Sequence, residues 1–160
     1  MIRYIKNALL VLLVPALASS CNTKKPAPEN STDSSTNNKT EMMEADRAFS
    51  KLSEEKGMRH ALMQYIDGKG VLLRPNSVPI VGVEAIDYIS QGNDTSYTMT
   101  WEPNGGSIAR SGELGYTYGV YSFKLKNKDS VIYGTYVSIW KRQPDGKWKF
   151  VLETGNEGVE

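Results

Sequence analysis

Three ionisable side chains are candidates for proton transfer in this chain. His60 is the only histidine, and imidazole is the side chain that titrates nearest to neutral pH. Asp67 follows on the same predicted helix, where a rotation of about 100° per residue places it on one polar stripe with His60. Glu113 follows a glycine just ahead of a tyrosine-rich segment. His60, Asp67 and Glu113 are therefore the candidates for acid–base catalysis, but we favour the other interpretation, that they belong to a solvated polar surface.

Four other residues are candidates for contact with a small molecule. Tyr116, Tyr118 and Trp101 lie in segments with strand-like alternation, where aromatic rings can line an apolar pocket. Arg74 would bind an anionic group if it points inward, and would pair with a surface acid if it does not. A pocket with few polar groups predicts a module that binds an apolar or amphipathic molecule.

Several kinds of chemistry have no support in the sequence. The chain contains no GxSxG and no GxxxxGK[ST] motif, which leaves nucleophilic hydrolysis and phosphate binding by a glycine-rich loop unsupported. One histidine and one cysteine do not provide the spacing of a metal site, so the sequence predicts neither a metal nor another cofactor. The 19 basic residues against 18 acidic residues also predict no nucleic-acid partner.

The first twenty residues have the pattern of an export signal. Arg3 and Lys6 precede an apolar run that is too short to span a bilayer and contains Pro15. The only cysteine, Cys21, follows directly after small residues, and this arrangement resembles the bacterial lipobox. We therefore expect residues 1–20 to be a lipoprotein signal peptide, Cys21 to be lipidated, and the protein to lie in the cell envelope membrane, facing the periplasm or the surface.

Residues 21–40 and 41–160 differ sharply in composition. Between Asn22 and Thr40 the only apolar residue is Ala27, so this segment cannot bury enough surface to offset its chain entropy. We expect it to be a disordered tether with a helix beginning near Thr40. Residues 41–160 then form a single folded domain.

The domain divides into helices followed by strands. Apolar residues at helical spacing predict helices over 41–57, 58–67 and 83–90, with short extended segments at 71–74 and 78–81. From Tyr97 onward the period changes to two, which predicts strands at 97–102, 107–111, 114–125, 130–142 and 148–154, with a turn at 103–106. Helices before a meandering antiparallel sheet predict an α+β fold with helices on one face of a curved sheet.

Pairing across the 126–129 turn sets a register for two of these strands. It places Tyr121 opposite Gly134 and Tyr136 opposite Gly119. Pairing Arg142 with Lys147 across the next turn extends the same arrangement to the last strand. One face is predicted to be the core, and it carries Tyr116, Tyr118, Val120, Val137, Ile139, Trp148, Phe150 and Leu152. The other face is predicted to be a homodimer interface, and it carries Tyr121, Tyr136 and Trp140 among smaller and polar residues.

Residues 41–160 resemble the nuclear-transport-factor-2-like superfamily, also called ketosteroid-isomerase-like or SnoaL-like. Five strings also resemble the domain-of-unknown-function group numbered 4440. They are Ala45-Asp46-Arg47-Ala48-Phe49, Val71-Leu72-Leu73-Arg74-Pro75, Ile80-Val81-Gly82, the segment 112–119 and the segment 139–148. The resemblance implies a cone-shaped fold with a pocket between helices and a concave sheet, commonly as a homodimer. It does not select a function, because isomerases, dehydratases and noncatalytic modules share the fold.

The resemblance also bears on catalysis. Ketosteroid-isomerase-like enzymes carry a catalytic aspartate before a proline at the position where this chain has Arg74 before Pro75. A guanidinium cannot act as a general base, which counts against the isomerase mechanism. Three hypotheses therefore remain: a binding module, an acid–base enzyme of isomerase, dehydratase or cyclase type, and a noncatalytic structural dimer. An enzyme requires a titratable group within hydrogen-bond reach of the pocket.

Overall fold

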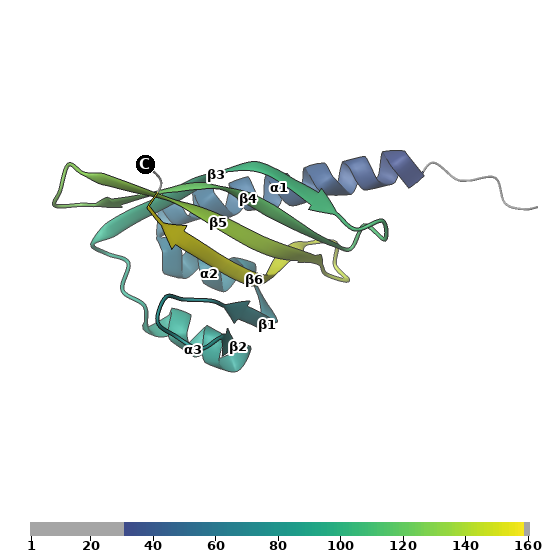
Figure 1. The fold of residues 1–160 in the computed structure, drawn as a ribbon. Helices are drawn as coiled ribbons and strands as arrows, with labels where there is room; N and C mark the ends of the chain where they lie inside the picture. Colours follow the sequence, from purple (N-terminus) through teal and green to yellow (C-terminus); the bar gives the residue numbers. More distant parts are fainter. Residues whose placement is uncertain (1–30, 159–160) are drawn as a thin grey trace, which may run out of the picture.

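The computed structural model describes residues 31–158 and confirms the predicted α+β class, with three helices beside one mixed sheet (Figure 1). The elements are α1 (Ser31–Lys56), α2 (Met58–Tyr65), β1 (Ile66–Leu72), β2 (Ile80–Val81), α3 (Val83–Gln91), β3 (Tyr97–Ile108), β4 (Leu114–Leu125), β5 (Val131–Arg142) and β6 (Trp148–Glu157). Helix α2 ends two residues before the predicted boundary, and β1 follows it directly.

Helix α1 begins earlier than predicted, because Ser31 lies inside the segment expected to be a tether. Further along, Asn38 donates a hydrogen bond from Nδ2 to the carbonyl of Gly112 at 3.3 Å. The expected helix start near Thr40 is therefore wrong. The signal peptide and Cys21 lie outside the described residues. No helix within 31–158 is long and apolar enough to cross a membrane.

One stripe of α1 holds the helix against the sheet. Met42, Asp46, Phe49, Ser50 and Ser53 recur at helical spacing and are all buried. Polar members of the stripe bond to β3: Ser50 Oγ accepts from the backbone N–H of Trp101 at 2.8 Å. Ser53 Oγ donates to the carbonyl of Met99 at 2.7 Å. The helix is thus fixed by hydrogen bonds as well as by apolar packing.

The sheet has the strand order β2-β1-β6-β5-β4-β3. Strands β3 to β6 form the predicted antiparallel meander, and β1 adds to its edge in parallel with β6. The turn predicted at 103–106 is wrong. Strand β3 continues through these residues to Ile108, with a bulge between Pro103 and Gly105 that absorbs the irregularity.

The predicted register between β4 and β5 is confirmed. Tyr121 pairs with Gly134, and Gly119 pairs with Tyr136. The predicted pairing of Arg142 with Lys147 is wrong. Arg142 pairs with Trp148 and Trp140 with Phe150, and beyond a bulge at Val151 Ile139 pairs with Leu152. The one-residue shift before the bulge places Trp148 and Phe150 on the same face as Trp140, opposite to the one expected.

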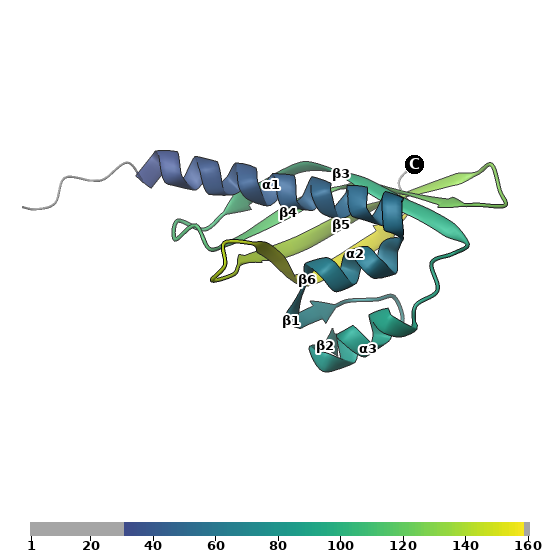
Figure 2. The ribbon, with the colours of Figure 1, turned by 180° about the vertical axis from the view of Figure 1, so that it is seen from behind.

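The two faces of the sheet are reversed relative to the sequence prediction. The inner face, which packs beneath the helices, carries Tyr121, Tyr136 and Trp140, all buried within the single chain. These residues therefore cannot form the predicted dimer interface. Tyr116 and Tyr118, expected in the core, are 45% and 50% exposed on the outer face, which no described helix covers (Figures 1 and 2).

Candidate functional site

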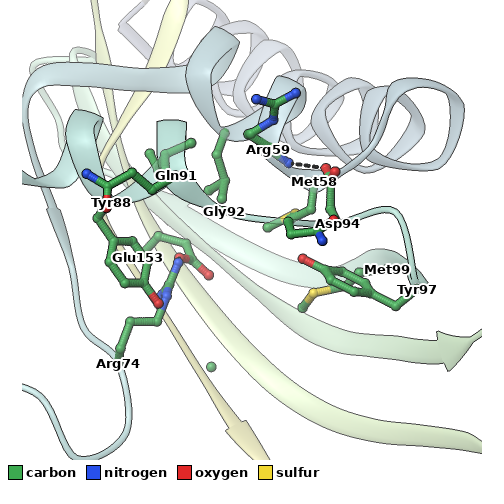
Figure 3. A pocket seen from close by; sticks show the side chains of 14 residues that line it. Met58, Arg59, Arg74, Tyr88, Gln91, Gly92, Asp94, Tyr97, Met99 and Glu153 are labelled. Atoms are coloured by element: carbon green, nitrogen blue, oxygen red, sulfur yellow. Dashed lines mark hydrogen bonds and ion pairs between the residues drawn. The ribbon is translucent and has the colours of Figure 1, made fainter.

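A cavity of about 500 Å³ opens between α2, α3 and the strands. Figure 3 shows its walls: Met58 and Arg59 come from the start of α2, Tyr97 and Met99 from the start of β3, and Glu153 from β6. Elements distant in sequence thus enclose one space.

The deeper part of the cavity is lined by apolar side chains, and its rim is polar. Met58, Leu62 and Ile89 are buried members of the hydrophobic core that also face this space. Tyr97 stacks on Phe123 with ring centroids 4.7 Å apart. The rim consists of Arg59, Tyr88, Gln91, Gly92, Asn93 and Asp94. This mixture of an apolar body and a few polar groups is typical of small-molecule sites.

An ion pair between Arg74 and Glu153 forms one side of the cavity. Arg74 Nη2 lies 2.6 Å from Glu153 Oε2, and the two side chains are only 21% and 10% exposed. Arg74 Nη1 also donates to the carbonyl of Leu73 at 3.1 Å. Arg74 follows β1 and Glu153 lies on β6, the two strands that pair in parallel, so the sheet itself holds this pair in place.

Asp94 orders the opposite side of the cavity. Its Oδ2 accepts a hydrogen bond from the backbone N–H of Arg59 at 2.7 Å, in the first turn of α2 (Figure 3). A carboxylate at this position caps free N–H groups and complements the helix dipole. Gly57 is required beside it, because its φ is +90° and an added Cβ would lie 2.4 Å from Asp94 Oδ2.

Burial raises the pKa of the Tyr97 hydroxyl, and the nearby Asp94 carboxylate raises that pKa further. Tyr97 is therefore a neutral phenol at physiological pH, able to donate or accept a hydrogen bond. The Tyr97 hydroxyl therefore adds an uncharged polar atom to the cavity wall.

A much smaller inner cavity of about 10 Å³ lies deeper between α1 and the sheet. It shares Met58, Met99 and Glu153 with the outer cavity and is closed at its far end by Trp101 and Tyr136. Its volume is close to that of one water molecule. The interior of the fold is thus filled by side chains, and the outer cavity is the space available to a ligand.

Behind that inner end lies a buried carboxylate, Asp46. Its Oδ1 accepts from Trp101 Nε1 at 2.7 Å and its Oδ2 from the Tyr136 hydroxyl at 2.8 Å. Burial raises the pKa of Asp46, although hydrogen bonds from Trp101, Tyr136 and Thr117 oppose that change. Burial and Asp46 together raise the pKa of Tyr136. Asp46 is fully buried, so it supports the site rather than contacting a ligand.

None of the three predicted acid–base residues lines the cavity. His60 is exposed in a shallow hollow with Arg59, Met63 and Ser90. Asp67 accepts hydrogen bonds from the Lys69 backbone N–H and from Gln143 Nε2, outside the cavity. Glu113 is exposed before β4. The structure does not bring these three side chains together.

The predicted ligand contacts separate into two groups. Arg74 lines the main cavity and Trp101 lines the inner one. Tyr116 and Tyr118 lie on the outer face of the sheet, because the prediction assigned the two faces the wrong way round.

Glu153 and Tyr97 also line the site, and neither was predicted from the sequence. The available signal for Glu153 was a carboxylate on a strand face otherwise rich in aromatic side chains. Its pairing with the arginine before Pro75 depends on the parallel contact of β1 with β6, which has no local sequence signature.

A second hollow of about 630 Å³ lies elsewhere, between α2 and the start of β6. Its lining includes Gln64, Lys147 and Asp145, and the last two form an exposed ion pair at 3.1 Å. Its lining also includes Ala45, Met63, Tyr65 and Trp148, but its charged pair is exposed to solvent, whereas the Arg74–Glu153 pair of the first cavity is largely buried. We therefore take the cavity at Arg74 and Glu153 as the candidate site. Within residues 31–158, no three histidine, cysteine, aspartate or glutamate side chains cluster in a way that could hold a metal ion.

Comparison with solved structures places the fold among nuclear-transport-factor-2-like and ketosteroid-isomerase-like proteins. A ketosteroid isomerase-like protein from Erwinia carotovora atroseptica is 13% identical, with a TM-score of 0.57 over 74% of this chain and 95% of that one. A protein from Novosphingobium aromaticivorans, nuclear-transport-factor-2-like with a cystatin-like fold, is 15% identical, with a TM-score of 0.59 over 75% and 81%.

A third structure, the hexachlorocyclohexane dehydrochlorinase LinA-type3 from Novosphingobium barchaimii, is 14% identical, with a TM-score of 0.59 over 79% of this chain and 91% of that one. No family model and no curated protein matches the sequence. At these identities the comparisons define the fold and leave the function to be argued from the site.

Proposed function

We propose that this protein binds a small amphipathic molecule in the cavity between α2, α3 and β6. The observation that carries the proposal is a cavity of about 500 Å³ with apolar side chains along its body and one buried ion pair, Arg74 with Glu153, at its side. An apolar body supplies affinity, and a few fixed polar groups supply orientation.

The positions of the ionisable groups support a binding function over acid–base catalysis. His60, Asp67 and Glu113 do not line the cavity. Glu153 does, but Arg74 engages its carboxylate, so the group is committed to an ion pair. A general base needs a free position within reach of the proton that it removes.

A fluorescent probe tests this proposal. Nile red, which is uncharged and apolar, should bind the wild-type protein saturably at one site. Gln91 is an exposed rim residue at the end of α3, and Gln91→Trp should obstruct the cavity and weaken binding at least about tenfold. Ser90→Trp, one residue away in the shallow hollow, is the matched control and should leave affinity unchanged. Equal affinities in all three proteins would rule out this cavity as the binding site.

The same proposal includes export and anchoring of the protein. Residues 1–20 have the composition of a lipoprotein signal, and Cys21 is placed for lipidation. Several acyl chains would hold the protein at a membrane of the cell envelope, with the domain beyond it. The five strings named above also support membership of the domain-of-unknown-function group numbered 4440.

We further propose that two copies pair through the outer face of the sheet. Tyr116, Tyr118, Val137, Ile139 and Leu152 are neighbours there in the strand register. None of them carries a charge, so a two-fold axis through this face would bring apolar centres together without burying like charges. An uncovered aromatic patch of this kind is typical of protein interfaces.

A further inference from the structure

We propose that the ligand of this cavity has an uncharged polar end that carries both a hydrogen-bond donor and an acceptor, as a carboxamide does. This inference rests on the proposed binding function and names the chemical class of its ligand. Its basis is the Arg74–Glu153 pair, which presents an N–H donor and a carboxylate acceptor side by side at the cavity wall (Figure 3).

The pair is held firmly enough to act as a fixed recognition element. Its atoms are 2.6 Å apart, and the Glu153 side chain is nine-tenths buried. Glu153 lies on β6 and Arg74 follows β1, the strand that pairs with β6, and the intervening Leu73 N–H donates to the carbonyl of Glu153 at 3.0 Å. A ligand therefore meets the guanidinium and the carboxylate together rather than either one alone.

The cavity as a whole has no excess of charge. Its charged lining residues are Arg59 and Arg74 against Asp94 and Glu153. Asp94 is engaged by the backbone of α2, and Glu153 by Arg74. The exposed Arg59 guanidinium lies at the rim and points away from Arg74 and Glu153 (Figure 3), so no unpaired charge lies beside that ion pair.

A charged ligand end would be disfavoured for this reason. An anion beside Arg74 would also approach Glu153, and a cation beside Glu153 would also approach Arg74. Separating the pair to accommodate either one would leave a buried charge without its partner, which is strongly unfavourable. An amide instead donates its N–H to the carboxylate and accepts from the guanidinium with its carbonyl, while the ion pair stays closed.

The rest of the ligand is expected to be apolar. Met58 and Met99 offer flexible thioether side chains that adapt to irregular shapes. Leu62 and Ile89 lie on the helices beside them, and Tyr97 provides an aromatic wall. A phenyl or alkyl group of moderate length would fill this part of the cavity.

Four probes with the same phenylalkyl body test the inference: 4-phenylbutanamide, 4-phenylbutanoate, 4-phenylbutylammonium and butylbenzene. Dissociation constants are measured on the wild-type protein at pH 7 by NMR titration. We expect the amide to bind at least about tenfold more tightly than the anion or the cation. Butylbenzene, which lacks a polar end, reports on the apolar cavity alone.

Two variants should invert the preference. Glu153→Gln leaves Arg74 as an unpaired cation, so 4-phenylbutanoate should bind this variant more tightly than the other three probes do. Arg74→Gln leaves Glu153 unpaired, so 4-phenylbutylammonium should become the tightest. The matched controls are Glu41→Gln and Arg142→Gln. Each breaks the ion pair between Arg142 and Glu41, whose atoms are 3.2 Å apart and which does not line the cavity, so both variants should keep the preference for the amide.

Each outcome decides a different point. Equal affinity for all four probes would overturn the inference while leaving the binding function intact, because butylbenzene would still bind. Tightest binding of the anion by the wild-type protein would overturn it by showing that Arg74 releases Glu153 to a ligand. Failure of every probe, butylbenzene included, would overturn the proposed function itself. If either variant proves unfolded by circular dichroism, the wild-type ranking of the probes still decides the inference.

Discussion

The hydroxyl of Tyr136 donates a 2.8 Å hydrogen bond to Oδ2 of Asp46, which joins the middle of α1 to the middle of β5. The second oxygen of Asp46 accepts from Trp101 Nε1 on β3. One carboxylate therefore connects the long helix to two strands of the sheet. Since the outer cavity lies between the other helices and this same sheet, the position of its walls depends on that connection.

Replacement of Asp46 by alanine should destabilise the fold strongly. Trp101 Nε1 and the Tyr136 hydroxyl would lose their acceptor in a buried environment, and each unsatisfied donor costs about 1 to 3 kcal/mol. We expect the free energy of unfolding to fall by about 2 to 4 kcal/mol in urea denaturation at pH 7. Glu44→Ala, an exposed acid on the same helix, is the control and should change stability by less than about 0.5 kcal/mol. If D46A lost no more free energy of unfolding than E44A, Asp46 would not be important for the stability of the fold.

The same carboxylate should make stability depend on pH. Burial raises the folded-state pKa of Asp46, so the folded chain retains this proton to a higher pH than the unfolded chain does. The contribution of Asp46 to the free energy of unfolding is then largest below its unfolded-state pKa of about 3.9. That contribution falls as the pH rises through the folded-state value.

Asp46→Asn removes this titration and serves as the reference. The free energy of unfolding of the wild-type protein, taken relative to D46N, should therefore decrease from pH 4 to pH 7. Urea denaturation across this range measures it. A difference that stays constant, or that increases with pH, would mean that the pKa of Asp46 is not raised in the folded protein.

The strand register was predictable because it follows from local residues. A four-residue connection fixes which positions of β4 and β5 face each other, and glycines opposite Tyr121 and Tyr136 leave room for their rings. An added Cβ at Gly134 would lie 2.3 Å from Tyr121 Cζ, which shows how closely that ring covers the glycine. Sequence alternation and turn length contain this information.

The choice of the inner face was not predictable from the strands alone, because both faces carry aromatic side chains. The polar residues of the inner face have buried partners: Trp140 Nε1 donates to Thr117 Oγ1 at 2.8 Å. Tyr136 finds its acceptor on α1, far away in the sequence. Alternation reports that two faces differ, but here the covering helix decides which face is buried.

The candidate site was predicted only in part, for a related reason. Arg74 was identified because of its type and its position before Pro75. Its partner Glu153 lies on the last strand, and the two meet only because β1 joins β6 in parallel. The bulge at Val151 shifts the register just before Glu153, and no residue type marks that position. The contact between Arg74 and Glu153 therefore depends on long-range strand pairing, which the local sequence pattern does not predict.

Two glycine substitutions should separate close packing from simple loss of glycine. Gly134→Ala would place a methyl group 2.3 Å from both the Asn156 carbonyl oxygen and the Tyr121 ring, so the sheet would have to shift. Overpacking of this kind costs about 1 to 3 kcal/mol. Gly68→Ala is the matched control, because nothing lies within 4 Å of its added Cβ. Thermal unfolding should show a lower Tm for G134A only; equal midpoints would contradict the observed packing.

Charges on the outer face should dissociate the proposed homodimer. Tyr116 and Tyr118 are about half exposed, so the double substitution Y116R/Y118R should leave the fold of the single chain intact. It would place like charges on both sides of a two-fold interface, and we expect monomers in sedimentation at concentrations where the wild-type protein is dimeric. Tyr88→Arg, an equally exposed tyrosine on α3, is the control. A wild-type protein that sediments as a monomer at every concentration would eliminate this interface.

Removal of the cysteine thiol should release the protein from the membrane. Cys21 is the only cysteine in the chain, so Cys21→Ser leaves no other site for a thioether-linked lipid. In bacterial cells the wild-type protein should fractionate with membranes, and its intact mass should lack residues 1–20 and include several acyl chains. C21S should lose the acyl mass and leave the membrane fraction, whereas Ser20→Ala, which keeps a small residue before the cysteine, should behave like the wild type. An unmodified Cys21 in membrane-bound wild-type protein would show that another feature anchors it.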